Sequence, residues 1–553
     1  DYNGVSTHTD ENGYFKLESS SVGIQFSDLG YFLDCPNCVP NKDTSGLNAQ
    51  VWFLIPTEYY TLKAVQIGQN ENVRGEMLSS SSSLVLLGSE GRFSFDGSSL
   101  QSAFNSIPGV QYDSRGYGGS SRISLRGSFL RSPFAVRNLK MYLNGIALTN
   151  PDGQSPLEMF DLSYLGQMEV TKGPAGALFG SGHGGVVQMQ LPALARNHLM
   201  LEAGSSVGEF GYRKGFIAAS GTHGKLSYGV HVNSQTTDGY RQQEWNFREN
   251  ILGNLNWNGK SNQKLIFIHY RGAWGLPGAL NATQVNENPT QAVSFAITNN
   301  TSVNKWRDMI AYTFDKKWGS QSIQFSANAY TSEKWNPYGT SVANSGYKNE
   351  NAFGGGFRGI YGKSWKLKGE IELLSQVGSE CQFEYLDFHE NSLVNGTSGD
   401  LKIAFESYAL NWNVFEQLSL KKGSVWSIHT SLGTNATPTV SKGTNFIADP
   451  PFQDLDSKVN YELKLYPRIG ASLQLNEHLF ASGNWTKGNS APSIFEQLDY
   501  NTNSINKLAS EYSSSSEIGI KSTWKFFQAG VALYNQEITN AIVVADTVID
   551  GLP

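Results

Sequence analysis

Apolar and polar residues alternate along most of the chain after about residue 196. Apolar side chains occupy nearly every second position in residues 226–233, 366–373, 408–414 and 426–432. A period of two places the apolar residues on one face of a β-strand and the polar residues on the other. Segments of about ten residues or more exceed the usual strand of a soluble sheet and suit a tilted crossing of a bilayer. This half of the chain is therefore predicted to form a large antiparallel sheet.

The predicted connections between these strands alternate in length. Asn258-Gly259 and Trp318-Gly319 are typical of tight turns, whereas residues 274–304, 332–351 and 433–457 are long, polar and rich in Asn and Gly. Membrane β-barrels have short turns on one side and long loops on the other. We expect about sixteen strands, fewer than the roughly 22 at which the largest plugged barrels close. Because an open edge cannot lie in lipid, further strands are expected beyond Pro553.

Composition favours the same class of protein. The chain of 553 residues is 16% charged and contains 58 Gly, 30 Phe, 25 Tyr and 12 Trp, whereas soluble proteins carry about 25% charged residues. No run of about 18 apolar residues is present, which excludes a helical membrane span. The alternative is a large soluble all-β protein such as a propeller or a solenoid.

The region before the long strands is predicted to contain shorter elements. Residues 99–105 predict a short helix with Leu100, Ala103 and Phe104 on one face, capped by Ser98 or Ser99. Short apolar strands that end in glycine follow at residues 123–127, 141–146, 168–174 and 178–187. Each is followed by a loop that contains Pro, Asp or Gly.

This succession resembles the plug domain of TonB-dependent outer-membrane receptors. It is most similar to the branch that includes the ferric dicitrate and pyrroloquinoline quinone receptors. The resemblance implies a plug at residues 71–195 and a transmembrane β-barrel at residues 196–553 that is incomplete at its C-terminal end. It also implies a mainly β fold, an outer-membrane location, and a plug and N-terminal extension that face the periplasm. Residues 1–60 resemble the later half of the small carboxypeptidase-regulatory-like β-sandwich found ahead of many Bacteroidota receptors.

Residues 61–70 lie where this family keeps its TonB box. The segment Tyr60-Thr-Leu-Lys-Ala-Val-Gln-Ile67 resembles such a box, with Leu62, Val65 and Ile67 alternating along an extended strand. Family members usually carry an acidic residue near the middle, where this chain has Lys63. The alternative is that the segment forms the last strand of the β-sandwich.

Two segments, residues 128–137 and 148–155, resemble the plug loops that touch ligand in this branch. By this resemblance the ligand-binding candidates are Arg131, Ser132 and Gln154, with Arg137 and Asp152 as weaker ones. The guanidinium group is a rigid fork of donors that fits carboxylates, which suits an anionic chelate or a quinone. The alternative is that Arg131 and Arg137 pair with carboxylates of the barrel.

Motifs of enzymes and cofactor sites are absent or misleading. Gly180-Ser-Gly-His-Gly-Gly185 fits G-x-G-x-x-G, but a strand pattern follows it, and a dinucleotide site needs a helix there. Cys35 and Cys38 form one CxxC, which favours a local disulfide over zinc. The net charge of −6 gives no reason to expect nucleic acid. We therefore expect no enzyme, no cofactor and no metal site.

The leading hypothesis is a TonB-dependent importer of a scarce small molecule, an iron chelate or siderophore. Its partners would be TonB with the inner-membrane energising complex, an anionic ligand, and outer-membrane lipid. The alternative is a non-transporting scaffold subunit of a larger outer-membrane assembly, with a surface lipoprotein as a partner. A TonB box that departs from the family pattern favours the scaffold hypothesis. Lys63 is such a departure and therefore keeps that alternative open.

Overall fold

The computed structural model describes most of the chain after residue 84 and a few short segments before it. The described residues are 31–34, 41–42, 48–49, 53–56, 84–87, 100–114, 119–127, 131, 136–195, 199–446, 453–461, 463–499, 504–505, 507–524 and 528–543. Ser132, the cysteines Cys35 and Cys38, and the predicted box residues Leu62, Val65 and Ile67 lie outside them.

The chain forms two compact units, and each is described by itself. The first consists of Asp1–Thr61 with Gly68–Glu76, and the second of Leu62–Ile67 with Met77–Pro553. In the first unit, β1 (Tyr31–Asp34) pairs with β4 (Phe53–Pro56), and β2 (Asn41–Lys42) pairs with β3 (Asn48–Ala49). Both pairings are antiparallel. That residues 1–60 belong to a β-sandwich stays a prediction.

The second unit begins with the segment that we call the plug, from Leu84 to Ala195. Its elements are β5 (Leu84–Leu87), α3 (Leu100–Asn105), β6 (Val110–Ser114), β7 (Ser121–Leu125), β8 (Leu139–Leu143), β9 (Ile146–Ala147), η2 (Leu157–Met159), η3 (Leu162–Tyr164), β10 (Gln167–Lys172), α4 (Gly176–Phe179) and β11 (Gly185–Gln190). Five strands form a mixed sheet in the order β5-β10-β11-β8-β9, in which β11 and β8 run parallel. The strands β6 and β7 form a separate pair.

The short pattern of the sequence predicts α3, β7, β8 and β10 correctly. Residues 178–187 are not one strand, because Leu178 and Phe179 end the helix α4 and β11 starts only at Gly185. The helix α3 buries Leu100, Ala103 and Phe104, the three residues predicted for its apolar face. The glycine-rich run before Gly185 leads into strand β11 and not into a helix, as the sequence pattern predicted. Gly185 has φ +152°, and a Cβ there would lie 2.4 Å from the Thr171 carbonyl oxygen, so the backbone conformation and the space both require glycine.

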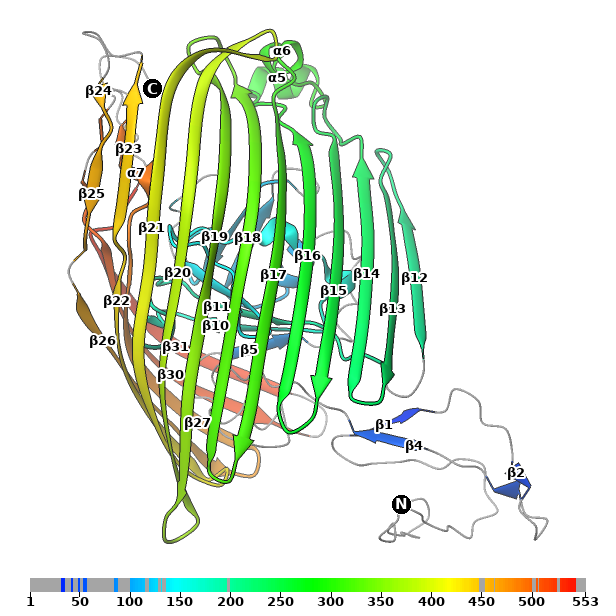
Figure 1. Ribbon diagram of the computed structural model, residues 1–553, viewed down its shortest axis with the longest axis vertical. Helices are drawn as coiled ribbons and strands as arrows, with labels where there is room; N and C mark the ends of the chain where they lie inside the picture. Colours follow the sequence, from blue (N-terminus) through cyan, green and yellow to red (C-terminus); the bar gives the residue numbers. More distant parts are fainter. Residues whose placement is uncertain are drawn as a thin grey trace. The chain divides into compact units, whose positions relative to one another are not determined.

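The rest of the second unit is an eighteen-stranded sheet, which we call the barrel sheet. Its strands are β12 (Met200–Val207), β13 (Arg213–His223), β14 (Leu226–Thr237), β15 (Asn246–Asn258), β16 (Asn262–Gly275), β17 (Ser302–Trp318), β18 (Gln321–Gly339), β19 (Ser345–Lys366), β20 (Ile371–Val394), β21 (Thr397–Lys422), β22 (Trp426–Ala436), β23 (Thr439–Asn445), β24 (Gln453–Asp454), β25 (Ser457–Val459), β26 (Lys464–Asn476), β27 (Leu479–Ser490), β30 (Glu511–Thr523) and β31 (Gln528–Thr539). The long strands curve around the plug (Figure 1).

Neighbouring strands of the barrel sheet are antiparallel, and β12 and β31 are its two edges. Within the described residues no pairing joins these edges, so the sheet is not closed. The barrel sheet has eighteen strands, whereas about sixteen were expected from the sequence. The interruption between β22 and β23 explains part of the difference, because both strands pair with β21 and are successive segments alongside it.

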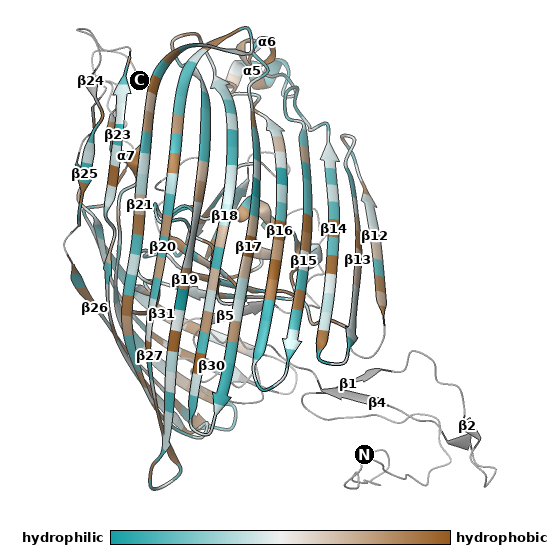
Figure 2. Cartoon of the chain, viewed as in Figure 1, coloured by the Kyte–Doolittle hydropathy of each residue, from teal (hydrophilic) through white to brown (hydrophobic). Residues whose placement is uncertain are grey.

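The barrel sheet places its apolar residues on the outside, the reverse of a soluble protein. In β14, Val230 and Val232 are each 44% exposed, whereas His231 and Asn233 are buried on the plug side. Hydrophobic and hydrophilic residues alternate along the long strands (Figure 2). A bilayer-facing sheet around a polar interior has this arrangement, so the predicted period of two is confirmed.

The predicted turns are confirmed, but three segments were assigned wrongly from the sequence. Residues 433–457 are not one long loop, because β22 continues to Ala436 and β23 covers Thr439–Asn445. Residues 366–373 are not one strand, because Gly369 at φ +74° and Glu370 at φ +61° form the turn between β19 and β20. Residues 332–351 are not a long loop, because β18 continues to Gly339 and β19 starts at Ser345. Both faces of these strand ends are polar, so the period of two disappears although backbone pairing continues.

The barrel sheet has two different ends. The turn end contains the short connections at residues 224–225, 319–320 and 367–370. The loop end contains residues 276–301, where α5 (Ala282–Glu287) and α6 (Ser294–Thr298) interrupt the predicted loop. The connection from β27 to β30 is also at the loop end and contains α7 (Ile494–Gln497), β28 (Leu498–Asp499) and β29 (Ser504–Ile505). Among the described residues no helix has the length and apolarity of a transmembrane helix.

The largest apolar core joins the plug to one side of the barrel sheet. Buried plug residues such as Phe104, Met141 and Phe160 share this core with side chains from β15, β16, β17 and β18. The contributing barrel residues are Leu252, Ile266, Ile268, Tyr270, Met309, Ala311 and Tyr330. We call this contact the apolar seam, because it fixes the plug against four neighbouring strands.

Candidate functional site

The 148–155 loop of the plug is folded by its own hydrogen bonds. The backbone N–H of Gln154 donates to Asp152 Oδ1 at 2.9 Å, and the N–H of Asn150 donates to the Gln154 carbonyl at 2.8 Å. Gly153, at φ +90°, makes the tight turn between them. The loop therefore holds Asp152 and Gln154, two of the predicted ligand residues, in a defined conformation.

The Arg131 side chain is fully buried between two carboxylates from the second half of the chain. Its Nε lies 2.7 Å from Glu496 Oε1, and its Nη1 lies 3.0 Å from Glu511 Oε2. The Nη2 atom of Arg137 donates to Glu496 Oε2 at 3.1 Å and to the Asp152 carbonyl at 2.7 Å. We call these five residues the arginine cluster. Both arginines thus pair with carboxylates beyond the plug, which was the alternative left open by the sequence.

The protein interior makes this cluster electrostatically tight. Burial lowers the pKa of the Arg131 guanidinium, and the carboxylate of Glu496 opposes that fall. Burial raises the pKa of the Asp152 carboxyl, although Arg137 favours its charged form. Each charge in the arginine cluster is stabilised by its partners, because a buried charge without a counter-charge is costly.

Glu496 reaches the arginines because of the local structure of α7. Ser493 and Glu496 form a capping box, in which Glu496 N–H donates to Ser493 Oγ at 3.2 Å and Ser493 N–H donates to Glu496 Oε2 at 2.8 Å. Glu496 was not among the residues predicted from the sequence. The S-x-x-E spacing was visible and predicts a helix start, but it gives no information about the distant partner.

The other side of α7 is apolar and packs on the wall of the barrel sheet. The Phe495 ring lies 5.2 Å from the Phe388 ring and 5.9 Å from the Phe405 ring, measured between centroids. Phe388 and Phe405 stack on each other at 4.7 Å, and Ile494 and Leu498 join the same cluster. Thus α7 presents a carboxylate to the plug and an apolar surface to β20 and β21.

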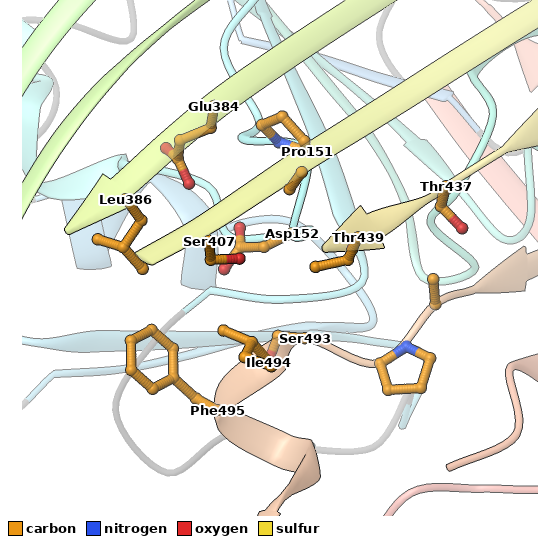
Figure 3. Close-up of a pocket in the computed structure, with 13 residues that line it drawn as sticks. Pro151, Asp152, Glu384, Leu386, Ser407, Thr437, Thr439, Ser493, Ile494 and Phe495 are labelled. Carbon is orange, nitrogen blue, oxygen red and sulfur yellow. The ribbon is translucent and has the colours of Figure 1, made fainter. Parts of the chain in front are cut away.

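A small cavity lies where the 148–155 loop, the barrel wall and α7 meet (Figure 3). Pro151 and Asp152 line it from the plug, Glu384 and Leu386 from β20, and Ile494 and Phe495 from the α7 segment. Its free volume is about 20 Å³, which is room for about one water molecule. In this conformation α7 fills the space beside the predicted ligand residues.

A wall of paired charges continues from this cavity toward the loop end. The hydroxyl of Tyr330 donates to Glu384 at 2.6 Å, and Lys334 donates to Glu350 at 2.7 Å. At a β-bulge in the β20–β21 pairing, Lys402 lies 4.0 Å from Glu390. The Lys334 side chain is 30% exposed, whereas Glu384 and Glu390 are buried, so only part of this wall is accessible to solvent.

Other buried ion pairs tie the plug to the barrel sheet. Asp161 accepts hydrogen bonds from Lys214 at 2.8 Å and from Arg248 at 2.5 Å. Although burial alone would raise it, the two cations hold the pKa of Asp161 down at about 2. On the far side of the plug, Arg126 lies 2.5 Å from Glu517 with both side chains 5% exposed. Arg126 therefore ties the plug to β30.

His183 lies in the glycine-rich run of the plug and contacts the arginine cluster. It is fully buried, and its Nε2 lies 2.8 Å from Glu511 Oε2. It therefore supports the carboxylate that pairs with Arg131. Among the described residues, no group of three or more His, Cys, Asp or Glu side chains is arranged to hold a metal ion.

The structure thus brings three of the five predicted ligand residues together. Arg131, Arg137 and Asp152 are in the arginine cluster, and Gln154 is next to it through its backbone bond to Asp152. Ser132 lies outside the described residues. The binding of a ligand by these residues stays a prediction.

Two family models match this chain. The model described as TonB-dependent Receptor Plug Domain matches residues 92–187. The model described as TonB dependent receptor-like, beta-barrel, matches residues 217–552.

Similar solved structures share the same fold at low sequence identity. The ferric citrate transporter FecA in the unliganded form is 15% identical, with a TM-score of 0.69 over 84% of this chain and 71% of that chain. The ferric yersiniabactin uptake receptor FyuA from Yersinia pestis is 11% identical, with a TM-score of 0.69 over 84% of this chain and 73% of that chain. The ferric-catecholate import receptor Fiu from E. coli K12 is 14% identical, with a TM-score of 0.62 over 84% and 76%.

Proposed function

This chain belongs to the TonB-dependent receptors of the outer membrane, and from that membership we propose that it actively imports a scarce small molecule, an iron chelate of the siderophore class. The family consists of transporters and not of enzymes. The observation that carries the proposal is the plug, which lies inside the barrel sheet and is tied to it by buried ion pairs. A barrel filled in this way does not let cargo diffuse through, so import requires work on the plug.

The ligand class follows from the charges of the site and from the structural neighbours. FecA, FyuA and Fiu are named for ferric citrate, ferric yersiniabactin and ferric catecholates. In this chain, Arg131 and Arg137 offer two guanidinium groups beside the 148–155 loop, a combination suited to an anionic chelate. We place the ligand at these arginines with Ser132, Asp152 and Gln154.

The energising partner in this proposal is TonB, acting from the periplasm through residues 61–70. The box residues Leu62, Val65 and Ile67 would add a strand to a sheet edge of TonB, so main-chain hydrogen bonds would carry the contact. This arrangement requires the plug and the N-terminal extension to face the periplasm.

The test begins with a deletion strain grown on different iron sources, which identifies the ligand. Uptake of that ligand is then measured in cells that carry Val65→Pro or Val65→Thr. Proline fixes φ and removes a backbone donor, so Val65→Pro should abolish uptake while ligand binding to cells persists. Val65→Thr keeps the backbone and should import normally.

Normal accumulation of ligand in Val65→Pro cells would contradict the proposal. Lys63, which replaces the acidic residue usual in the box, favours the second candidate function in that event. That function is a non-transporting scaffold of an outer-membrane assembly.

A further inference from the structure

The α7 segment stands where the proposed ligand has to bind. Its Glu496 carboxylate bridges Arg131 and Arg137, and its residues Ile494 and Phe495 line the cavity beside the 148–155 loop. Small-molecule sites occupy roughly 300–1,000 Å³, but this cavity has a free volume of about 20 Å³. A chelate that contacts the two arginines must therefore displace α7.

The contacts of α7 determine how easily it can be displaced. The helix has only four residues, and a helix of that length has no stability of its own in water. Among the described residues, its main tertiary contacts are the charged contact of Glu496 with the plug arginines and the apolar contact of Phe495 with Phe388 and Phe405. Just before the helix, Ala491 also accepts a hydrogen bond from Arg131 and donates one to Ser181. Loss of either contact favours release of the segment.

We propose that α7 is a built-in mimic of the ligand, so that the imported molecule is an amphiphilic anion that carries a carboxylate-like group next to an aromatic or apolar group. This inference rests on the proposed function and names the chemical class of its substrate. The anionic group takes the place of Glu496 between Arg131 and Arg137. The apolar group covers Phe388 and Phe405, which α7 covers in its absence.

The apolar contact that α7 makes with Phe388 and Phe405 determines which chelates can replace it with high affinity. A purely hydrophilic chelate such as ferric citrate replaces the carboxylate but leaves the Phe388 and Phe405 surface uncovered when α7 departs. Exposure of apolar surface to water is unfavourable, so such a chelate binds less tightly. A chelate with an aryl group compensates for the exposed surface by packing on the same rings.

The first experiment measures hydrogen exchange of residues 491–499 in the purified full-length receptor, with the iron(III) complex of salicylate as the probe. Glu496→Gln keeps the shape of the side chain and removes its charge. Exchange in this segment should rise about tenfold, and affinity for the salicylate complex should rise by a similar factor, as for the loss of one hydrogen bond to a charged group. Glu477→Gln is the matched control, because Glu477 is 84% exposed in the turn between β26 and β27.

A second measurement needs no variant of the cluster. In the wild-type receptor, saturating ferric salicylate should increase exchange of residues 491–499, and ferric citrate at equal concentration should do so at least about tenfold less effectively. Unchanged or slower exchange on addition of ferric salicylate overturns the proposal. Equal potency of ferric citrate overturns the assignment of an amphiphilic class.

The uptake assay separates the two proposals. Failure of α7 to respond, together with loss of uptake in Val65→Pro cells, overturns the mimic and leaves the importer supported. Release of α7 by ferric salicylate, together with normal uptake in Val65→Pro cells, supports the ligand class and overturns energised import.

Discussion

Asp161 shows how much a single plug residue contributes to the seating of the plug. Its carboxylate is 1% exposed and accepts hydrogen bonds from Lys214, Arg248 and the neighbouring Ser163. Asp161→Asn leaves two buried cations without a counter-charge. We expect the plug to lose about 3–5 kcal/mol of stability, measured by the urea dependence of plug hydrogen exchange. Asp113→Asn, which changes a half-exposed partner of Arg122, should change stability by less than about 1 kcal/mol.

The same carboxyl predicts how the plug responds to acid. Its pKa falls from 3.8 in the unfolded chain to about 2 in the folded plug. A depressed folded pKa means that the contribution is fully present above pH 3.8 and is lost as the pH falls toward 2. The loss should approach about 2 kcal/mol. Urea unfolding of the plug at pH 5 and pH 2.5 measures it, and the Asp161→Asn variant should lack this part of the pH dependence.

Single residues also mark the limit of what the sequence predicts about the site. The guanidinium group of Arg131 indicated a carboxylate partner, because such groups are rarely buried alone. Its partner Glu496 is 365 positions away along the chain, and no local spacing can indicate that contact. Asp161 and Arg248 are 87 positions apart and were missed for the same reason.

Whole elements were easier to predict where one face meets lipid. The apolar face of strands such as β14 and β21 gives a clear period of two, and both strands were found. Toward the loop end the period disappears, so the ends of β18 and β19 were taken for loop. The helix α5 buries no residue and therefore has no apolar face that a pattern could reveal.

The contact between the elements α4 and β22 predicts the effect of a side chain at Gly433. A Cβ on Gly433 of β22 would lie 2.0 Å from the carbonyl oxygen of Ala177 in α4. Gly433→Ala should push the plug helix away from the strand and destabilise the plug by about 1–3 kcal/mol. Gly253→Ala in β15 is the control, because nothing lies within 4 Å of its Cβ position. Equal thermal unfolding of the two variants would contradict the close approach.

The whole molecule should behave as a membrane β-barrel. Strands in a bilayer must satisfy every backbone group with a neighbouring strand, and such a structure resists unfolding by detergent. The full-length protein should therefore migrate faster on a denaturing gel without heating than after boiling. A single band at the same position in both samples would argue against a barrel.

The apolar seam makes the two sides of the plug unequal. Against β15–β18 the plug shares a continuous apolar core with the barrel sheet. Separation of the plug from these strands would expose apolar side chains to water. Against α7 and β30 the plug is held by ion pairs of Arg126, Arg131 and Arg137. Water or another ion can replace the carboxylates in these pairs. Breaking a buried ion pair is costly unless water or an ion replaces the lost partner, so a pulling force meets less resistance on the charged side once water has entered there. The plug should swing about the apolar seam, and the passage for cargo should open along β27 and β30.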